Sequence, residues 1–254
     1  MDLPKNHFKQ AIRAGRQQIG LWVSLANAFS AEIVAGSGFD WLLLDTEHCP
    51  AEVTTVFPQL QAVAPYPVSA VVRPAWNDKV LVKRHLDQGA QTLLVPYVST
   101  AVEAAAAVAY VRYPPRGIRG VAGSTRAAQY GRIKDYAKRC EEELCLLVQV
   151  ETREGLDNIE AIAKVDGVDG VFIGPADLSA GLGHLGNIGH PEAQAAIFDG
   201  IKRIKACGKA PGILAMDEPF ARKAMEAGTL FTAVGMDLVL LARESEKLAA
   251  RFKA

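Results

Sequence analysis

The chain has 254 residues, of which 50% are hydrophobic and 22% are charged, an ordinary composition for a globular protein. Its 28 basic and 28 acidic residues cancel, so the charge balance favours neither nucleic acid nor an anionic membrane as a partner. No apolar run approaches the roughly twenty residues that span a bilayer. The N-terminal segment lacks the apolar core of a signal peptide. Four cysteines without a CxxC pair indicate free thiols and a cytoplasmic protein.

Short apolar runs rich in branched residues predict eight strands buried on both faces, as in a parallel sheet. We expect them at residues 19–23, 41–44, 70–72, 92–95, 146–150, 171–173, 212–214 and 230–234. Segments with helical spacing follow them, at residues 30–36, 51–63, 77–88, 102–111, 152–164, 193–206, 219–226 and 238–252. A short helix at residues 8–14 comes first, and Ser30 is the expected N-cap of the next helix. This order predicts an α/β fold, a single (β/α)₈ barrel over residues 1–254.

One connection is unusually long for such a barrel. Residues 112–143 separate the helix at 102–111 from the strand at 146–150 and contain the sequence YPPRGIRG. Long loops inside compact domains are usually functional, so we expect a functional loop or a lid here. The glycine-rich residues 181–189 look like a phosphate loop, but no Gly-Lys-Ser/Thr follows and the signal is weak.

Polar side chains gather where the predicted strands end, and the active sites of such barrels lie at those ends. They are Asp45, Glu47 and His48 after the second strand, Arg73 after the third, Gln149 and Glu151 at the fifth, and Asp177 after the sixth. Glu151 and Asp177 follow adjacent strands, so their oxygens can face one another and suit a hard divalent cation. Each alone would be an ordinary surface acid. As a pair they favour a metal site.

The other rim residues have natural chemical tasks. Arg73 could fork onto a substrate carboxylate or stabilise a developing oxyanion. His48 is the only histidine near a predicted strand end, which makes it the default general base, with Asp45 to orient it. The backbone N–H groups of Ala176 and Asp177, if they open a helix, could bind an anionic oxygen.

Structural alternatives stay open for several of these residues. His48 could bond within a turn, Arg73 could form a structural ion pair, and Glu47 could as well support another site residue as act in the site itself. Trp22, at the end of the first strand, fits core packing and a substrate wall about equally. The remaining histidines, His7, His85, His184 and His190, are expected at the surface. A Schiff-base aldolase is disfavoured because no predicted strand contains a lysine; Lys209 lies just before the seventh.

Five separated motifs carry a family resemblance. They are DTEHxP at residues 45–50, VRP at 72–74, YPPxGxRG at 113–120, VQVET at 148–152 and FIGPADLS at 172–179. Together they resemble the HpcH/HpaI family of metal-dependent class II pyruvate aldolases, over nearly the whole chain. The resemblance implies a (β/α)₈ barrel whose last helix is swapped within a dimer, with dimers forming a hexamer. It also implies reversible cleavage of 4-hydroxy-2-oxo acids, as in aromatic catabolism, into pyruvate and an aldehyde, with Mg²⁺, Mn²⁺ or Co²⁺.

The resemblance also assigns roles to individual residues. Glu151 and Asp177 match the metal ligands, Gln149 matches the amide beside the metal's water, and Arg73 matches the arginine that stabilises the pyruvate enolate. His48 matches the proton-transfer residue, with Asp45 as its partner. Asp87 matches an acid that reaches this histidine from a neighbouring subunit. Substrate contacts are expected from Arg73, Gln149, Ala176, Asp177, Trp22 and Leu214. The competing enzyme is a lyase of malyl-CoA or citramalyl-CoA, which should need a basic nucleotide groove that the sequence near the predicted rim does not indicate. A non-enzymatic assembly subunit would not require so many polar groups to converge.

Overall fold

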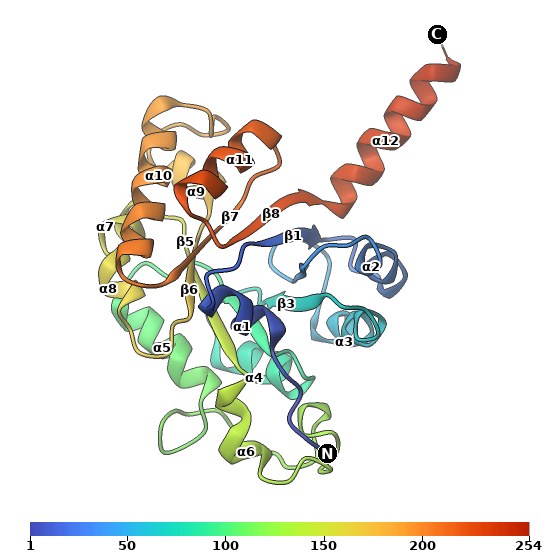
Figure 1. The fold of residues 1–254 in the computed structure, drawn as a ribbon, viewed down its shortest axis with the longest axis vertical. Coiled ribbons are helices and arrows are strands. Elements are labelled where there is room, and N and C mark those ends of the chain that lie inside the picture. Colours follow the sequence, from blue (N-terminus) through green and yellow to red (C-terminus); the bar gives the residue numbers. More distant parts are fainter. Residues whose placement is uncertain (254) are drawn as a thin grey trace.

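Eight parallel strands close into a barrel in the computed structural model, which describes residues 1–253. The strands are β1 (Gln18–Val23), β2 (Trp41–Asp45), β3 (Ser69–Arg73), β4 (Thr92–Val95), β5 (Cys145–Val150), β6 (Gly170–Ile173), β7 (Ala210–Leu214) and β8 (Phe231–Met236). Strands adjacent in sequence are adjacent in the barrel, and the pairing of Ile19 with Thr232 joins β1 to β8. The predicted (β/α)₈ barrel is therefore confirmed (Figure 1).

Helices surround this barrel. They are α1 (His7–Arg13), α2 (Ala28–Ala35), α3 (Val53–Val63), α4 (Lys79–Asp87), α5 (Ala101–Val111), α6 (Tyr136–Arg139), α7 (Arg153–Asp157), α8 (Ile159–Ala163), α9 (Pro175–Gly181), α10 (Pro191–Ala206), α11 (Glu218–Ala227) and α12 (Asp237–Phe252). None in residues 1–253 has the length and apolarity needed to cross a bilayer. All four cysteines are free thiols.

Two helix predictions need correction. The predicted helix at 152–164 is two short helices separated by Asn158. The Asn158 side chain donates to the Ser99 carbonyl at 2.9 Å. Ser30 is not an N-cap. Asn27 accepts the N–H of Phe29 at 2.7 Å, so α2 begins earlier and Ser30 lies inside it. In both places a side-chain bond to the backbone decided the helix boundary.

Aromatic rings fill the interior of the barrel. Trp22, Trp41, Phe172 and Phe231 are all buried, with contacting ring centroids 5.5–6.3 Å apart. Phe8 of α1 closes the N-terminal end, with its ring 5.8 Å from that of Trp41. A glycine at position 20 makes room for this packing, because a Cβ there would lie 2.2 Å from the Trp41 ring. Large aromatic side chains therefore make the barrel interior a packed core.

The long segment 112–143 lies at the N-terminal edge of the barrel. It leads from α5 to β5, and the connection from a helix back to a strand ends at that edge. The start of the chain binds it there: Lys5 pairs with Glu143 at 2.9 Å, and the Asn6 N–H donates to the same carboxylate at 2.7 Å. Figure 1 shows α6 of this segment beside the N-terminus. The segment is therefore at the opposite edge from the C-terminal ends of the strands, so the predicted lid is wrong for the site expected at the strand ends of its own chain.

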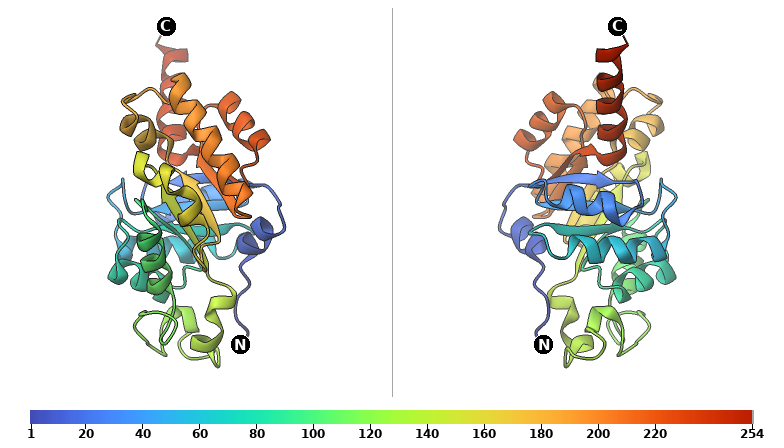
Figure 2. Two further views of the ribbon diagram at one scale, coloured as in Figure 1. Left: turned by 90° about the vertical axis from the view of Figure 1, so that its left-hand side faces the viewer. Right: turned by 90° about the vertical axis from the view of Figure 1, so that its right-hand side faces the viewer.

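The last helix leaves the body of the barrel. α12 projects at the end of the molecule opposite the N-terminus (Figures 1 and 2). Among its described residues only Asp237 is buried, and its carboxylate accepts the N–H groups of Ser24 and Leu25 at 2.9 and 3.2 Å. Its exposed apolar residues are Leu238, Leu240, Leu241, Leu248 and Phe252. Such an uncovered apolar stripe is expected of a helix that packs on another protomer; the swap itself stays a prediction.

Candidate active site

The ends of β2 and β3 bring Asp45 and Arg73 together. The strand register pairs the two residues directly. Nε and Nη2 of Arg73 donate to the two Asp45 carboxylate oxygens, each at 2.8 Å, and the side chains are 6% and 1% exposed. The guanidinium also lies over the Trp22 ring, 5.0 Å from its centroid. This is a buried, bidentate ion pair on an aromatic floor, the structural alternative that the sequence left open for Arg73.

His48 does not contact Asp45. The His48 side chain is 64% exposed, and its Nε2 lies 3.6 Å from a carboxylate oxygen of Glu47. The Asp45 oxygens are engaged by Arg73 and by the backbone N–H of Glu47 at 3.0 Å. The predicted Asp45–His48 pair is therefore wrong within this chain, because the guanidinium fork occupies both carboxylate oxygens.

Glu47 lies between Arg73 and His48. Its Oε2 is 2.8 Å from Nη1 of Arg73, and its side chain is 9% exposed. Burial raises the pKa of Glu47 to about 7, although the Arg73 charge lowers it; the charges of Asp45 and Asp177 raise it further. A carboxyl group that titrates near neutrality at the barrel rim can exchange a proton or help to hold a cation.

Glu151 is fixed at the end of β5 by two hydrogen bonds. Its Oε2 accepts the side-chain N–H of Gln149 at 2.5 Å, and its Oε1 accepts the backbone N–H of Tyr97 at 2.8 Å. Burial raises the pKa of Glu151 to about 7; these two bonds lower it, and the charges of Glu47 and Asp177 raise it. The nearby charges of Glu47 and Asp177 thus disfavour ionisation of Glu151.

The start of α9 brings Asp177 to the same place. α9 begins directly after Gly174 and carries Ala176 and Asp177, both exposed, in its first turn. The expectation that these two residues open a helix is confirmed, and their N–H groups have no partner within the helix. Gly174 is required by the packing, because a Cβ there would lie 2.7 Å from Oε2 of Glu151. The first turn of α9 therefore lies against the Glu151 carboxylate.

The remaining residues that were predicted to contact the substrate lie inside the barrel or at the end of β7. Trp22 is 2% exposed and packs among the interior rings beneath Arg73, so it is a core residue whose ring forms a floor. Leu214 is half-buried at the end of β7 and packs against the same interior cluster. Gln149 is buried, and its Oε1 has no hydrogen-bond partner among the described residues. That unpaired oxygen lies beside Glu151, where a bound water or substrate group could satisfy it.

Asp87 lies apart from these residues. It is the last residue of α4, and its carboxylate accepts a hydrogen bond from Arg119 at 2.8 Å. The Arg119 side chain is fully buried, whereas that of Asp87 is 23% exposed. Sequence alone would make Asp87 a solvated surface acid, but the structure gives it a buried cationic partner. Its predicted contact with a neighbour's histidine stays a prediction.

One of the four histidines expected at the surface is buried. His85 is 1% exposed on the inner side of α4, where burial lowers its pKa to about 4. The prediction for His85 was wrong because its neighbours on α4 are charged, although the residue itself faces the packed side of the helix. His184 and His190 are partly exposed, and His7 is exposed.

Two aromatic residues at the rim were not predicted. Trp76 and Tyr97 follow β3 and β4, and their rings stack with centroids 5.2 Å apart. Tyr97 has φ 58°, in the left-handed region, and its N–H donates to Glu151. The sequence signal was available, since both residues lie within three positions of a strand end. The role of Tyr97 through its backbone has no sequence signature.

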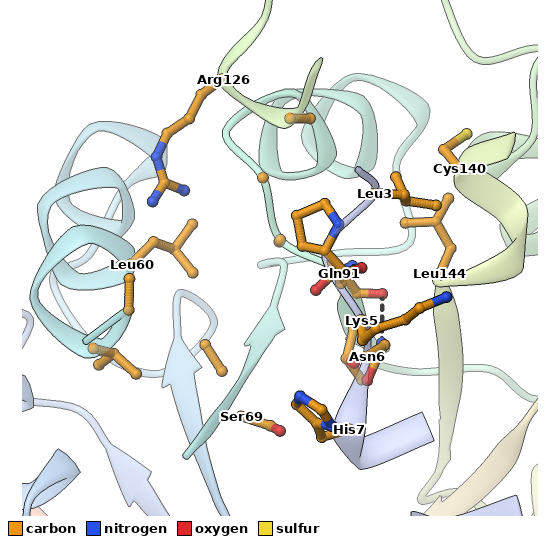
Figure 3. Close-up of a pocket in the computed structure, with 18 of the residues that line it drawn as sticks. Leu3, Lys5, Asn6, His7, Leu60, Ser69, Gln91, Arg126, Cys140 and Leu144 are labelled. Atoms are coloured by element: carbon orange, nitrogen blue, oxygen red, sulfur yellow. Dashed lines mark hydrogen bonds between the residues drawn. The ribbon is translucent and has the colours of Figure 1, made fainter. Parts of the chain in front are cut away.

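A separate cavity of about 610 Å³ lies at the N-terminal edge (Figure 3). Lys5, His7, Gln91 and Arg126 are among the residues that line it. This cavity is at the opposite end from the acidic rim, and barrels of this type have their chemistry at the C-terminal ends of the strands. We therefore assign the active site to the rim rather than to this cavity.

Comparison with known proteins decides the family. Residues 18–243 match the HpcH/HpaI aldolase/citrate lyase family. The chain belongs to this family. A relative from Rhizobium etli named pyruvate aldolase is 63% identical over 252 residues, 99% of each chain. A relative from Salmonella paratyphi C named 4-hydroxy-2-oxo-heptane-1,7-dioate aldolase is 59% identical, covering 98% of this chain and 95% of its own.

A solved structure agrees with this assignment. A protein of the HpcH/HpaI family from Burkholderia cenocepacia superposes with a TM-score of 0.95 at 40% identity, covering 98% of this chain and all of its own. The rim residues of the present chain therefore belong to an HpcH/HpaI barrel. Close relatives of this chain are aldolases, so the chain is a carbon–carbon lyase.

Proposed function

We propose that the rim catalyses reversible aldol cleavage of 4-hydroxy-2-oxo acids, such as 4-hydroxy-2-oxoheptanedioate, to pyruvate and an aldehyde. The observation that carries the proposal is the convergence of Arg73 with the carboxyl groups of Glu47, Glu151 and Asp177 at one end of the barrel. Breaking the C3–C4 bond leaves negative charge on the 2-oxo oxygen of pyruvate, which the Arg73 guanidinium and a cation held by the carboxylates would stabilise. The names of the two relatives support the same chemistry.

The donor set fits a divalent cation. Burial and the charges of neighbouring carboxylates raise the pKa of Glu47 and of Glu151 to about 7, and a bound cation would favour the ionised form of both. Glu151 and Asp177 offer oxygens only, which suits Mg²⁺, Mn²⁺ or Co²⁺ better than softer ions. When bound, the cation supplies Lewis acidity toward the carboxylate and keto oxygens of pyruvate. Gln149 holds Glu151 in place and has an amide oxygen left for a water.

Arg73 contributes from a fixed position. Its side-on fork is held by Asp45, and Nη1 lies 2.8 Å from the Glu47 carboxylate, which leaves the outer N–H of Nη2 for another partner. This donor can stabilise the enolate oxygen as the bond breaks, without reorganising during the reaction. The N–H groups of Ala176 and Asp177 would hold the pyruvate carboxylate. Asp45 is thus a positioning residue for Arg73.

The proton of the C4 hydroxyl needs an acceptor on the solvent side of this cluster. His48 is exposed there, with Glu47 as the nearby carboxylate of its own chain. We assign His48 as the base, either directly or through a water, with Asp87 of a neighbouring protomer as a second carboxylate. Trp22 and Leu214 would border the pyruvate methyl group.

We place the enzyme in the cytoplasm as a homo-oligomer, a hexamer built from three dimers. The free thiols agree with a reducing compartment. The uncovered stripe on α12 supports the oligomer, as do Phe29 and Ile33 of α2, which are 73% and 61% exposed. Isolated apolar residues are common on surfaces, but two helices with uncovered apolar faces in one chain favour mutual burial between protomers.

The test is pyruvate release from 4-hydroxy-2-oxoheptanedioate, coupled to lactate dehydrogenase. Asp177→Asn should abolish cleavage that depends on added Mn²⁺, and EDTA should do the same to the wild type. Asp199→Asn, an exposed acid on α10, is the matched control and should retain full activity. Unchanged release by Asp177→Asn or by chelated enzyme would disprove the proposal. Turnover of malyl-CoA with no turnover of the hydroxy-oxo acid would establish the CoA-thioester lyase instead.

A further inference from the structure

A group of nitrogen and oxygen donors lies outside the catalytic rim, at the start of α10. His184, His190 and Glu192 each offer one donor atom, and the three atoms lie within 4.8 Å of one another. Nε2 of His184 is 2.8 Å from a carboxylate oxygen of Glu192. The imidazole rings stack, with centroids 3.5 Å apart and planes at 17°. None of these residues has a task in the proposed reaction.

The backbone around this group is well fixed. The hydroxyl of Ser179, which is fully buried, donates to the carbonyls of His184 and Asn187 at 2.8 and 3.1 Å. In turn, the His184 N–H donates to the Ser179 carbonyl, and the His190 N–H to the Asn187 carbonyl. Both histidines are therefore held in one short closed loop, so little loop entropy would be lost on binding a ligand.

We propose that His184, His190 and Glu192 bind a divalent transition-metal cation of the Zn²⁺ class. Two imidazoles and one carboxylate suit such an ion, whereas the all-oxygen pair at the rim suits Mg²⁺ or Mn²⁺. Nδ1 of His190 accepts the Glu192 N–H at 3.3 Å, so this tautomer has its proton on Nε2. Binding of the metal at Nε2 moves that proton to Nδ1 and breaks this capping bond. The cation replaces the hydrogen bond between His184 and Glu192, and the half-exposed His190 ring turns out of the stack to converge on it.

Binding at this site would fix the segment between α9 and α10. Arg153 competes weakly for the carboxylate, since its Nη2 is 4.0 Å from Glu192 and both side chains are more than half exposed. The bound ion would join the loop after α9 to the first turn of α10. Its expected effect is stabilisation of this segment, with no participation in cleavage.

The experiment measures binding of Zn²⁺, and of Co²⁺ by its visible absorption, to the full-length Asp177→Asn protein, which removes the rim ligand. His190→Asn keeps an N-cap acceptor and His184→Phe keeps an aromatic ring, so both should fold while losing at least ~10- to 100-fold in affinity, the cost of disturbing even an outer-shell partner. His7→Asn, at an exposed histidine, is the control. Binding that is equal in all four proteins would overturn the proposal.

A second, independent observation concerns the aromatic pair at the rim. Trp76 and Tyr97 are 52% and 40% exposed, yet their rings stack beside the carboxylate that Tyr97 holds through its N–H. A non-glycine residue in the left-handed region costs about 1–3 kcal/mol, and this strain persists only where surrounding contacts impose it. Here the N–H bond to Glu151 imposes it. The tyrosine ring is thereby held next to the reacting groups.

We infer that the Trp76–Tyr97 stack is a wall of the aldehyde subsite and favours aldehydes with a flat, aromatic or extended apolar substituent. This inference rests on the proposed aldolase function. A rigid pair of rings adjacent to the site offers a third ring a stacking surface of about 0.5–1.5 kcal/mol beyond area burial. In the proposed function the pyruvate half of the substrate would instead contact Arg73 and the first turn of α9.

The test compares benzaldehyde-type and acetaldehyde-type acceptors in the synthetic direction with pyruvate. Tyr97→Asn removes the ring but tolerates the left-handed backbone and keeps the N–H, whereas Tyr97→Phe keeps the stack. We expect Tyr97→Asn to raise KM for the aromatic aldehyde about 2- to 10-fold, with KM for pyruvate and for acetaldehyde unchanged. An equal effect on both aldehydes would refute the wall. If the wild-type protein does not convert pyruvate with either aldehyde, the aldolase function is refuted instead.

Discussion

Asp45→Asn separates two roles that this residue could have. In the structure the Asp45 carboxylate accepts two hydrogen bonds from Arg73 and one from the Glu47 backbone, and it has no contact with His48. Asparagine keeps the shape but removes the charge, and it places an NH₂ group against one N–H of the guanidinium. We expect the Arg73 side chain to lose its fixed orientation as a result.

The magnitude follows from the burial of the pair. Removing one partner of a buried ion pair costs about 3–5 kcal/mol. Glu47 lies 2.8 Å from Nη1 of Arg73 and remains as a second carboxylate, so we expect the lower end of that range. About 3 kcal/mol corresponds to a fall in Tm of roughly 6–12 °C for a chain of this size. Loss of one oriented donor to the enolate should lower kcat by about 10²–10³-fold.

The assay is a pair of double-mutant cycles on pyruvate release at 20 °C, where each variant is first checked for native circular dichroism. If Asp45 acts through Arg73, then Asp45→Asn and Arg73→Lys should be strongly non-additive, because lysine lacks the fork that Asp45 holds. The losses of kcat caused by Asp45→Asn and by His48→Ala should instead multiply, which corresponds to additive free energies. The opposite pattern, additive with Arg73→Lys and non-additive with His48→Ala, would refute the positioning role.

Three further predictions concern pH, assembly and shared sites. Because burial raises the pKa of Glu151 from 4.5 to about 7, the metal-free protein should lose up to about 3 kcal/mol of stability as pH rises from about 4.5 to 7. Urea unfolding should show this loss in the wild type and a flatter profile in Glu151→Gln; an identical profile in both would contradict it. Truncation before Arg243 removes the C-terminal part of α12 with Leu248 and Phe252 and should give smaller, less stable particles by light scattering; a stable, active monomer would count against the oligomer. Mixed oligomers of His48→Ala and Asp87→Ala subunits should regain activity above the average of the two parents, and no gain in verified mixed oligomers would exclude a shared site.

The sequence predicted the barrel because each strand and helix has its own local signal. Apolar runs ending at Asp45, Arg73 and Glu151 placed these residues at strand ends, and the fold puts strand ends at one rim. Local signals do not specify which side chains then pair. The register that sets Asp45 opposite Arg73 is a property of the closed barrel. As a result Asp45, which was expected to orient His48, is paired with Arg73.

The residues that sequence reasoning missed act in ways that residue type does not reveal. Tyr97 holds Glu151 through a backbone N–H, a group that every residue except proline has. For Glu47 the sequence left a direct and a supporting role equally open, because its elevated pKa depends on burial at the closed rim. His85 was expected at the surface because its packed side depends on the rotation of α4 about its axis.

The position of Asp87 decides which histidine it could contact. α4 runs from the catalytic rim back toward the N-terminal edge, so its last residue ends at the edge opposite the exposed imidazole of His48. Asp87 therefore cannot serve its own chain's histidine. It is held by Arg119 of segment 112–143 yet stays 23% exposed, which leaves a carboxylate oxygen for a partner from another protomer. If mixed oligomers are not rescued, the Arg119 pair is the whole role of Asp87, and Asp87→Ala should then lower stability without changing the pH profile of cleavage.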